Sequence, residues 1–134
     1  MIFDPIRVKW LLAQPEELVR QAVLWALLHE WQLPKAKIAI EYSITIQNKK
    51  HRCDIVLVDN EYQPAVIIEV KAPTEILSSS AFQQLSRYGS ITRANYFWLT
   101  NGINNYSFER RDNKWLSAEV NEIIMKYRDL VVYK

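Results

Sequence analysis

The stretch from residue 37 to residue 71, KIAIEYSITIQNKKHRCDIVLVDNEYQPAVIIEVK, decides the fold. Apolar and polar residues alternate over its first third, which is the pattern of a half-buried strand. Polar residues at 48–51 and 59–60 mark turns, and the apolar runs at 53–58 and 65–70 are typical of two further strands. The stretch therefore predicts three strands in an antiparallel meander.

Helices are predicted on both sides of this meander. Residues 15–31 begin with a proline and two acids and continue with apolar residues at helical spacing, so we expect a helix there. A second helix is expected over residues 81–88, with Gly89 as its left-handed C-cap. A third is expected over residues 117–127, capped by its first serine.

Two more strands are expected at residues 96–100 and 106–109, joined by a tight reverse turn at Asn101-Gly102. Because the second helix separates the third and fourth strands, it makes these two strands parallel. The order αβββαββα indicates an α/β or α+β fold with a mixed sheet flanked by helices. Before the first helix, residues 6–12 could form a short extended arm. No repeat or linker interrupts the chain, so residues 1–134 are expected to form a single domain.

The composition is that of an ordinary globular protein. The chain is 49% hydrophobic and 24% charged and has a net charge of +2, so it is neither disordered nor strongly basic. Its one cysteine cannot form an internal disulfide, and two histidines do not make a zinc cluster, which favours a reducing compartment. The sequence shows neither an apolar run of about 20 residues, as a membrane helix needs, nor a signal peptide. We therefore expect a cytoplasmic protein with no membrane partner.

Charged side chains converge on one face of the second and third predicted strands. Glu69 and Lys71 are two residues apart on a strand, so both project to the same face. A hairpin register that pairs residue 58 with residue 65 would place Asp54 opposite Glu69. Two carboxylates and an ammonium group would then lie side by side.

This set of groups suits the hydrolysis of phosphodiesters. Mg²⁺ or Mn²⁺ binds one or two carboxylates and leaves positions for water and a substrate phosphate. Asp54 and Glu69 would hold the metal, and the carbonyl of Val70 would be a further ligand. Lys71 would orient or help to deprotonate the attacking water. The alternative explanation is a surface strand whose charges form cross-strand salt bridges.

Basic residues lead along the second strand into this site. Lys49, Lys50 and Arg52 are the predicted phosphate contacts, and Arg52 would share the face of Lys71. Cys53 is expected to be buried on the opposite face. Most of the five tryptophans are expected in the core rather than stacked on bases, since burial explains a large aromatic residue more often.

Five segments stand in a recognisable order: PEELVRQ (15–21), RCDIVLV (52–58), IIEVKAP (67–73), FQQLSRY (82–88) and FWLTNG (97–102). In this order they resemble the PD-(D/E)xK nuclease superfamily. More specifically, residues 6–108 are similar to the N-terminal nuclease domain of type I restriction enzyme R subunits. The resemblance implies a restriction-endonuclease-like fold, with Asp54 and Glu69 as metal ligands and Lys71 as the catalytic lysine.

The resemblance implies further site residues on the two helices. Gln84 and Tyr88 match the Q-x-x-x-Y pair of related nucleases and, four residues apart on a helix, would share a face. The alternative is a core role for Tyr88 and a solvated Gln84. One of Glu16 and Glu17 would supply the helix acid that often completes the metal site, with Glu17 favoured, although acids are common at helix starts in any case.

The expected function is therefore that of a Mg²⁺-dependent endonuclease on DNA in restriction-modification, with RNA as an alternative substrate. Cys53 stands where the motif's name has proline, and the GxxxxGK[ST] loop of an ATP-driven motor does not occur. We expect a detached module or one component of an assembly, with DNA and a motor or specificity subunit as partners. A homodimer would suit the cutting of two strands. Two other functions stay open: a non-cleaving nucleic-acid-binding or assembly module of the same fold, and an unrelated structural protein.

Overall fold

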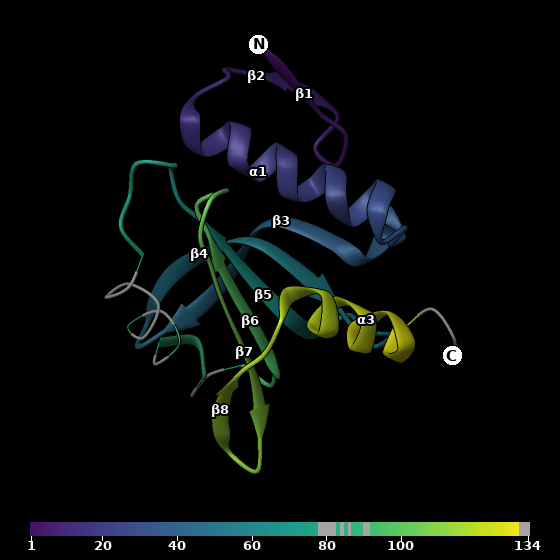
Figure 1. Ribbon diagram of the computed structural model, residues 1–134, viewed down its shortest axis with the longest axis vertical. Helices are drawn as coiled ribbons and strands as arrows, with labels where there is room; N and C mark the ends of the chain where they lie inside the picture. Colours follow the sequence, from purple (N-terminus) through teal and green to yellow (C-terminus); the bar gives the residue numbers. More distant parts are fainter. Residues whose placement is uncertain (78–82, 84, 86, 90–91, 132–134) are drawn as a thin grey trace.

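The computed structural model describes residues 1–77, 83, 85, 87–89 and 92–131. Its centre is a six-stranded sheet with the strand order β3-β4-β5-β6-β7-β8 (Figure 1). The strands are β3 (Ile38–Ile46), β4 (Lys49–Val58), β5 (Pro64–Val70), β6 (Tyr96–Thr100), β7 (Asn105–Arg111) and β8 (Lys114–Ser117). Together with its helices, this mostly antiparallel sheet forms a mixed α+β fold.

The strand connections follow the pattern predicted from the central stretch. β3, β4 and β5 form an antiparallel meander. β6 lies beside β5 and runs parallel to it, from Val66 opposite Tyr96 to Val70 opposite Thr100. Residues 71–95 therefore cross from the end of β5 to the start of β6, which confirms the predicted parallel pair. β7 and β8 then extend the sheet in antiparallel fashion.

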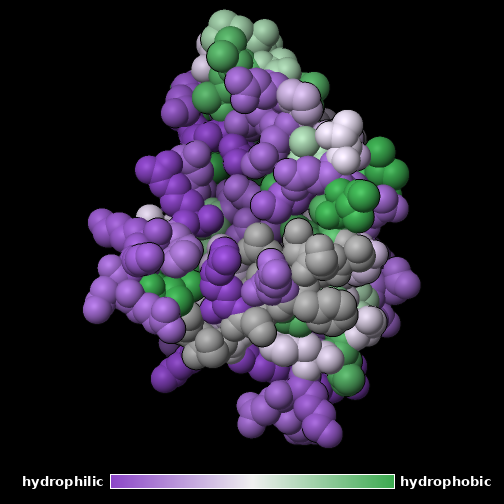
Figure 2. Space-filling model, turned by 90° about the vertical axis from the view of Figure 1, so that its left-hand side faces the viewer, coloured by the Kyte–Doolittle hydropathy of each residue, from purple (hydrophilic) through white to green (hydrophobic). Residues whose placement is uncertain are grey.

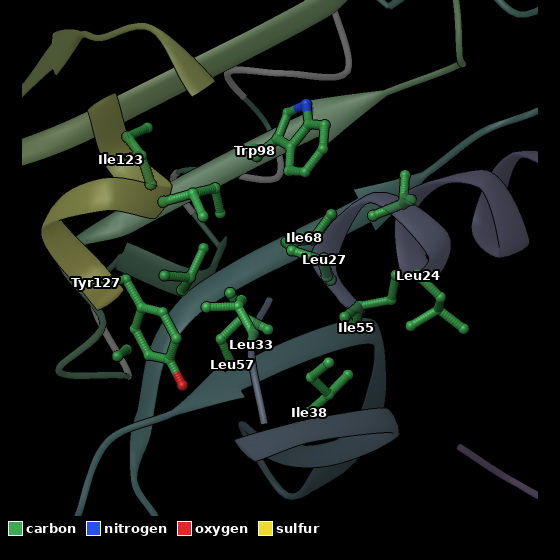
Figure 3. Packing of buried hydrophobic residues seen from close by; sticks show 14 of the residues in the cluster. Leu24, Leu27, Leu33, Ile38, Ile55, Leu57, Ile68, Trp98, Ile123 and Tyr127 are labelled. Carbon is green, nitrogen blue, oxygen red and sulfur yellow. The ribbon is translucent and has the colours of Figure 1, made fainter. Parts of the chain in front are cut away.

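Two helices, α1 (Pro15–Trp25) and α3 (Val120–Val131), pack on one face of the sheet. α1 continues as a π-helical turn (Ala26–Glu30), so the first helix ends close to the predicted boundary. Figure 3 shows the shared apolar cluster, which includes Leu24, Leu27, Ile55, Leu57, Ile68, Ile123 and Tyr127. The Tyr127 hydroxyl also donates a buried hydrogen bond of 2.6 Å to the carbonyl of Val58 and so fixes α3 to the end of β4. A short 3₁₀ turn (Lys35–Lys37) precedes β3.

Described residues of the crossover pack against the opposite face of the sheet. Helical conformation is described for residues 83, 85 and 87–89, which lie within the predicted second helix or at its end. Leu85 and Tyr88 join a second apolar cluster with residues of the sheet, among them Val56, Ile67 and Leu99. The sheet is thus covered on both faces, and the two clusters bury most of β4, β5 and β6.

The role predicted for Gly89 is wrong. Gly89 belongs to the helix, and among the described glycines only Gly102 has a positive φ, of 88°. The missing side chain of Gly89 instead admits the indole of Trp115 on β8, because an added Cβ would lie 2.9 Å from its Nε1 atom. A close approach between helix and strand, rather than a left-handed turn, explains this glycine.

Several turns differ from their predicted positions. Gln47 and Asn48, with φ of 49° and 64°, make the whole turn between β3 and β4, so β4 already begins at Lys49. The loop at 101–104 is longer than the predicted two-residue turn, because the Asn101 Oδ1 atom accepts hydrogen bonds from the backbone amides of residues 103 and 104. The serine predicted to cap the last helix is instead the final residue of β8.

A small N-terminal hairpin, β1 (Ile2–Asp4) and β2 (Lys9–Leu11), lies on the side of α1 that faces away from the sheet (Figure 1). Apolar side chains are exposed on it, and Figure 2 shows the corresponding hydrophobic surface at the top of the molecule. Trp10 there is 63% exposed and Trp25 of α1 is 56% exposed, so the expectation that most tryptophans are buried is wrong for these two. Within the described part of the chain, no helix is both long and apolar enough to cross a membrane.

Candidate active site

The pairing of β4 with β5 ends next to Asp54 and Glu69, the predicted metal ligands. Their ladder has the predicted register from Ile55 opposite Ile68 onwards, with an irregularity only at Val58, which faces residue 64 rather than residue 65. One step beyond Ile55 and Ile68, the side chain of Asp54 replaces the main chain: its Oδ2 atom accepts a hydrogen bond of 2.7 Å from the amide of Val70. Asp54 therefore fills the gap where the two strands separate.

Glu69 lies next to Asp54 and is buried, with 4% of its surface exposed. Burial, and secondly the charge and the hydrogen bonding of Asp54, raise the pKa of Glu69 to about 9, against the opposing effects of the Tyr88 hydroxyl and the Lys71 ammonium group. The Oε1 atom of Glu69 is buried and has no hydrogen-bond partner among the described residues. A buried carboxyl oxygen without a hydrogen-bond partner is costly, and a proton, a bound water or a bound cation would each satisfy it.

Cys53 and Tyr88 complete the surroundings of Glu69. The expectation that Cys53 points to the opposite face is wrong: it packs in the same apolar cluster as Tyr88, whereas Ile55 packs on the side of α1. In a regular strand, residues 53 and 55 would lie on the same face, so the alternation of side chains is interrupted between them. The interruption lies opposite Glu41 of the neighbouring strand β3, which has a positive φ of 54°. Burial, followed by the charge of Glu69, raises the pKa of the Cys53 thiol to about 12.

Tyr88 is a core residue whose hydroxyl also lies against Glu69. Its side chain is 4% exposed and packs in the core, and its hydroxyl acts on the carboxylate of Glu69. Burial and then the charge of Glu69 raise the pKa of Tyr88, so this hydroxyl stays protonated. Gln84, the other half of the predicted pair, lies outside the described residues.

Arg20 is a site residue that the sequence argument missed. Its guanidinium Nη1 is 2.9 Å from Glu17 Oε1, and its Nη2 is 3.2 Å from Asp54 Oδ1. The residue is 8% exposed, although it is charged. The signal was present in the sequence, because Arg20 stands at helical spacing with the core residues Val23, Leu24 and Leu27, and an arginine in an apolar stripe needs a partner.

The two acids at the start of α1 differ in their contacts. Glu17, favoured by the resemblance, accepts hydrogen bonds from Arg7 at 3.1 and 3.2 Å, from Gln21 at 3.0 Å and from Arg20 at 2.9 Å. Glu16 has its pKa raised by partial burial and then by the charge of Asp54. The guanidinium of Arg20, which contacts Asp54, is 2.9 Å from Glu17 and 3.9 Å from Glu16, so both acids lie on the Asp54 side of α1. Glu17 is also held by Arg7 of the N-terminal segment.

The predicted phosphate contacts lie along the first half of β4. Lys49 and Lys50 are exposed at its start. The side chain of Arg52 is 73% exposed, and its guanidinium is 4.0 Å from the carboxylate of Glu41 on β3. These three residues form a basic edge that precedes Asp54 on the same strand, and we call it the β4 basic edge.

The residues present fit a hard divalent cation. Within the described ranges, no group of three or more His, Cys, Asp and Glu side chains is arranged to hold a metal ion. Asp54 and Glu69 nevertheless supply two adjacent carboxylates, and one buried oxygen of Glu69 lacks a partner. Mg²⁺ needs no more than one or two carboxylates when water and a phosphate complete its shell.

The fold and the site define an α+β protein with a carboxylate pair and a lysine at the point where two strands separate. Comparison with known families goes one step further: the model of the type I restriction enzyme R protein N terminus matches residues 15–123, and the chain belongs to this family. The match begins with α1, ends in α3 and includes the whole six-stranded sheet. Membership links the chain to DNA restriction. The comparison with curated proteins gives no match.

Proposed function

We propose that the chain is a metal-dependent nuclease that hydrolyses DNA phosphodiester bonds, with Mg²⁺ or Mn²⁺ held by Asp54 and Glu69. The observation that carries the proposal is the buried, unpartnered Oε1 atom of Glu69 beside a second carboxylate. Two adjacent carboxylates out of water repel each other. A divalent cation bound between them removes this repulsion and is attracted to both. Family membership supports DNA as the substrate.

The residues around the pair have separate tasks in this proposal. When bound, the metal would polarise the phosphate and lower the pKa of the attacking water. Asp54 is oriented by the Val70 amide, and Glu69 is held by its buried position. Lys71 follows β5, where its backbone amide donates a hydrogen bond of 2.9 Å to the carbonyl of Thr100. Its ammonium group, whose charge acts on Glu69, would orient the water and offset developing charge.

Other residues take supporting roles. Among the acids of α1, we propose Glu16 rather than Glu17 as the one that contributes to the metal site, because both oxygens of Glu17 already accept hydrogen bonds from Arg7, Arg20 and Gln21. The Tyr88 hydroxyl would orient Glu69, and Gln84 stays a candidate from sequence alone. The carbonyl of Val70 is the proposed backbone ligand. The β4 basic edge would contact phosphates of the substrate.

The family also suggests the setting of this activity. We propose that the chain acts in the cytoplasm as the nuclease part of a restriction assembly that includes a motor or specificity subunit. A homodimer would allow both strands of a duplex to be cut. Sedimentation of the chain alone and with DNA would distinguish these forms.

The activity is tested with purified protein, Mg²⁺ or Mn²⁺, and plasmid, single-stranded DNA and single-stranded RNA. We expect cutting of DNA that falls by about 10²-fold or more in Glu69→Ala and Lys71→Ala, because each change removes a group acting on the transition state. The controls Glu61→Ala and Lys114→Ala change an exposed acid and an exposed lysine and should keep full activity. If the unaltered protein and both site variants cut equally weakly, a contaminant is responsible and the proposal fails.

One observation favours the alternative, a non-cleaving DNA-binding or assembly module. Arg20 already neutralises part of the charge of Asp54. Such a module would bind DNA with an affinity that drops steeply with salt, but it would not cut. A protein that neither binds nor cuts DNA would exclude both functions.

A further inference from the structure

Arg20 places a cation against the proposed metal-binding carboxylates. Its guanidinium is 2.9 Å from Glu17, 3.2 Å from Asp54 and 3.9 Å from Glu16. Arg20 is 8% exposed, and its Nε atom is buried without a hydrogen-bond partner among the described residues. The guanidinium of Arg20 thus lies among three acids, of which Glu17 also contacts Arg7, in a partly dehydrated place where charges interact strongly.

The guanidinium is anchored more firmly on the side away from Asp54. Its 2.9 Å contact with Glu17 has the length of a charge-assisted hydrogen bond, whereas the 3.2 Å contact with Asp54 is longer. Glu17 is itself fixed by Arg7, whose Nε donates a 2.6 Å bond to the fully buried Asp4. Arg20 can therefore give up Asp54 and still keep Glu17.

We propose that Arg20 is a positioning residue that occupies Asp54 in the metal-free protein and sets the metal affinity by competing for that carboxylate. This inference rests on the proposed metal site. A cation bound to Asp54 meets the charge of Arg20 at short range, and like charges in partly buried surroundings repel. Arg20 therefore keeps the fold stable without metal and makes metal binding weaker than the bare carboxylates would allow.

The test measures Mn²⁺ affinity directly, by electron paramagnetic resonance of free Mn²⁺ and by calorimetry. We expect Arg20→Met to bind Mn²⁺ about tenfold more tightly than the unaltered protein, which is ~1.4 kcal/mol. Arg20→Lys retains the charge and should stay close to the unaltered affinity. Arg111→Met removes an arginine of β7 whose side chain is 65% exposed and is the matched control, and Glu69→Ala should lose binding.

The possible results separate this inference from the proposed function. Equal Mn²⁺ affinity in Arg20→Met and the unaltered protein, with loss in Glu69→Ala, overturns the role of Arg20 and leaves the metal site standing. Weaker binding in Arg20→Met also overturns it, because Arg20 would then only orient Asp54. Absence of Mn²⁺ binding in every protein overturns both proposals.

A second measurement needs only the unaltered protein, in case Arg20→Met does not fold. The buried Nε–H group of Arg20 should give its own nuclear magnetic resonance signal, assigned by its loss in Arg20→Lys. We expect this signal to shift during a Mg²⁺ titration and to reach saturation together with the binding curve. A signal that stays in place while Mg²⁺ binds would contradict competition for Asp54.

Discussion

Asp54 shows how a single side chain serves both the fold and the proposed chemistry. One of its oxygens accepts the Val70 amide in the gap between β4 and β5, and the other lies against Arg20. Both contacts are made to groups of the protein itself. Loss of activity after a change of Asp54 is therefore ambiguous unless the stability of the variant is known.

Replacement of Asp54 should separate these two effects. Asp54→Ala leaves the Val70 amide and the guanidinium of Arg20 without their acceptor, so we expect a loss of about 3 kcal/mol in the free energy of unfolding. Asp54→Asn retains a carbonyl oxygen for the amide and should lose only about 1 kcal/mol, while still abolishing metal binding. Urea denaturation in the presence of a chelator measures both values. Equal stabilities of the two variants would show that the Val70 bond contributes little.

Glu109 on β7, outside the proposed site, makes the stability of the fold depend on pH. Lys126 holds it with contacts of 2.6 and 2.8 Å, and these hydrogen bonds, followed by that of Arg111, lower the pKa of Glu109. The folded protein therefore binds this proton less tightly than the unfolded chain. The stabilisation is complete above the ordinary pKa of 4.5 and is lost as the pH falls through the lowered value.

Thermal denaturation across this range tests the prediction. We expect Glu109→Gln to be less stable than the unaltered protein by about 1 kcal/mol at neutral pH, with the difference disappearing as the pH falls through the lowered pKa of Glu109. Glu61→Gln, at an exposed turn, should run parallel to the unaltered protein throughout. A difference for Glu109→Gln that does not change with pH would mean that the carboxylate charge is not what stabilises this contact.

At the level of the elements, the predictions succeed where burial leaves a pattern. β5 and β6 consist mostly of buried apolar residues and appear within a residue of their predicted ends. β1, β2 and β8 have three or four residues and mixed exposure, so no periodicity reveals them. The face of the sheet on which Cys53 lies could not be predicted either. It depends on the break in alternation opposite Glu41, and a positive φ at a non-glycine residue leaves no signal in the sequence.

The contact between the crossover helix and β8 can be tested at Gly89. Alanine is the better helix former, yet its Cβ would lie 2.9 Å from Trp115 Nε1, and the indole is itself stacked against the guanidinium of Arg110 at 4.7 Å. We expect Gly89→Ala to cost about 1–3 kcal/mol of stability through overpacking. In a Trp115→Leu background the same change should be neutral or favourable. Additive effects in this double-mutant cycle would contradict a clash between the two residues.

For the whole molecule, sheet register could be inferred but the facing of helices could not. The predicted hairpin register holds from Ile55 opposite Ile68 to Leu57 opposite Val66, and Glu69 lies close enough to Asp54 for the charge of Asp54 to raise its pKa. Which acid of α1 turns towards the pair depends on how the helix is rotated over the sheet. Packing of α1 against the hairpin and the sheet decides that rotation, and it places Arg20 at the site as well.

Substrate binding by the whole surface should depend on the β4 basic edge rather than on the net charge of +2. We expect the double variant Lys49→Ala and Lys50→Ala to bind DNA more weakly and to reduce the slope of log affinity against log salt by about 0.9 for each lost phosphate contact. A control that replaces two other exposed lysines, Lys9 and Lys114, should keep the slope. Equal slopes in both double variants would show that DNA does not contact the β4 basic edge through Lys49 and Lys50.

The parallel junction of β5 and β6 has a consequence for the order of folding. β3 to β5 and β6 to β8 are each joined by short local turns, whereas the junction between them closes only after residues 71–95 have crossed the sheet. Local hairpins form faster than contacts that must first close a long loop. Asp54 and Glu69 can therefore come together early, within the first group of strands. Glu69 loses its contact with water only in the late step that docks the second group.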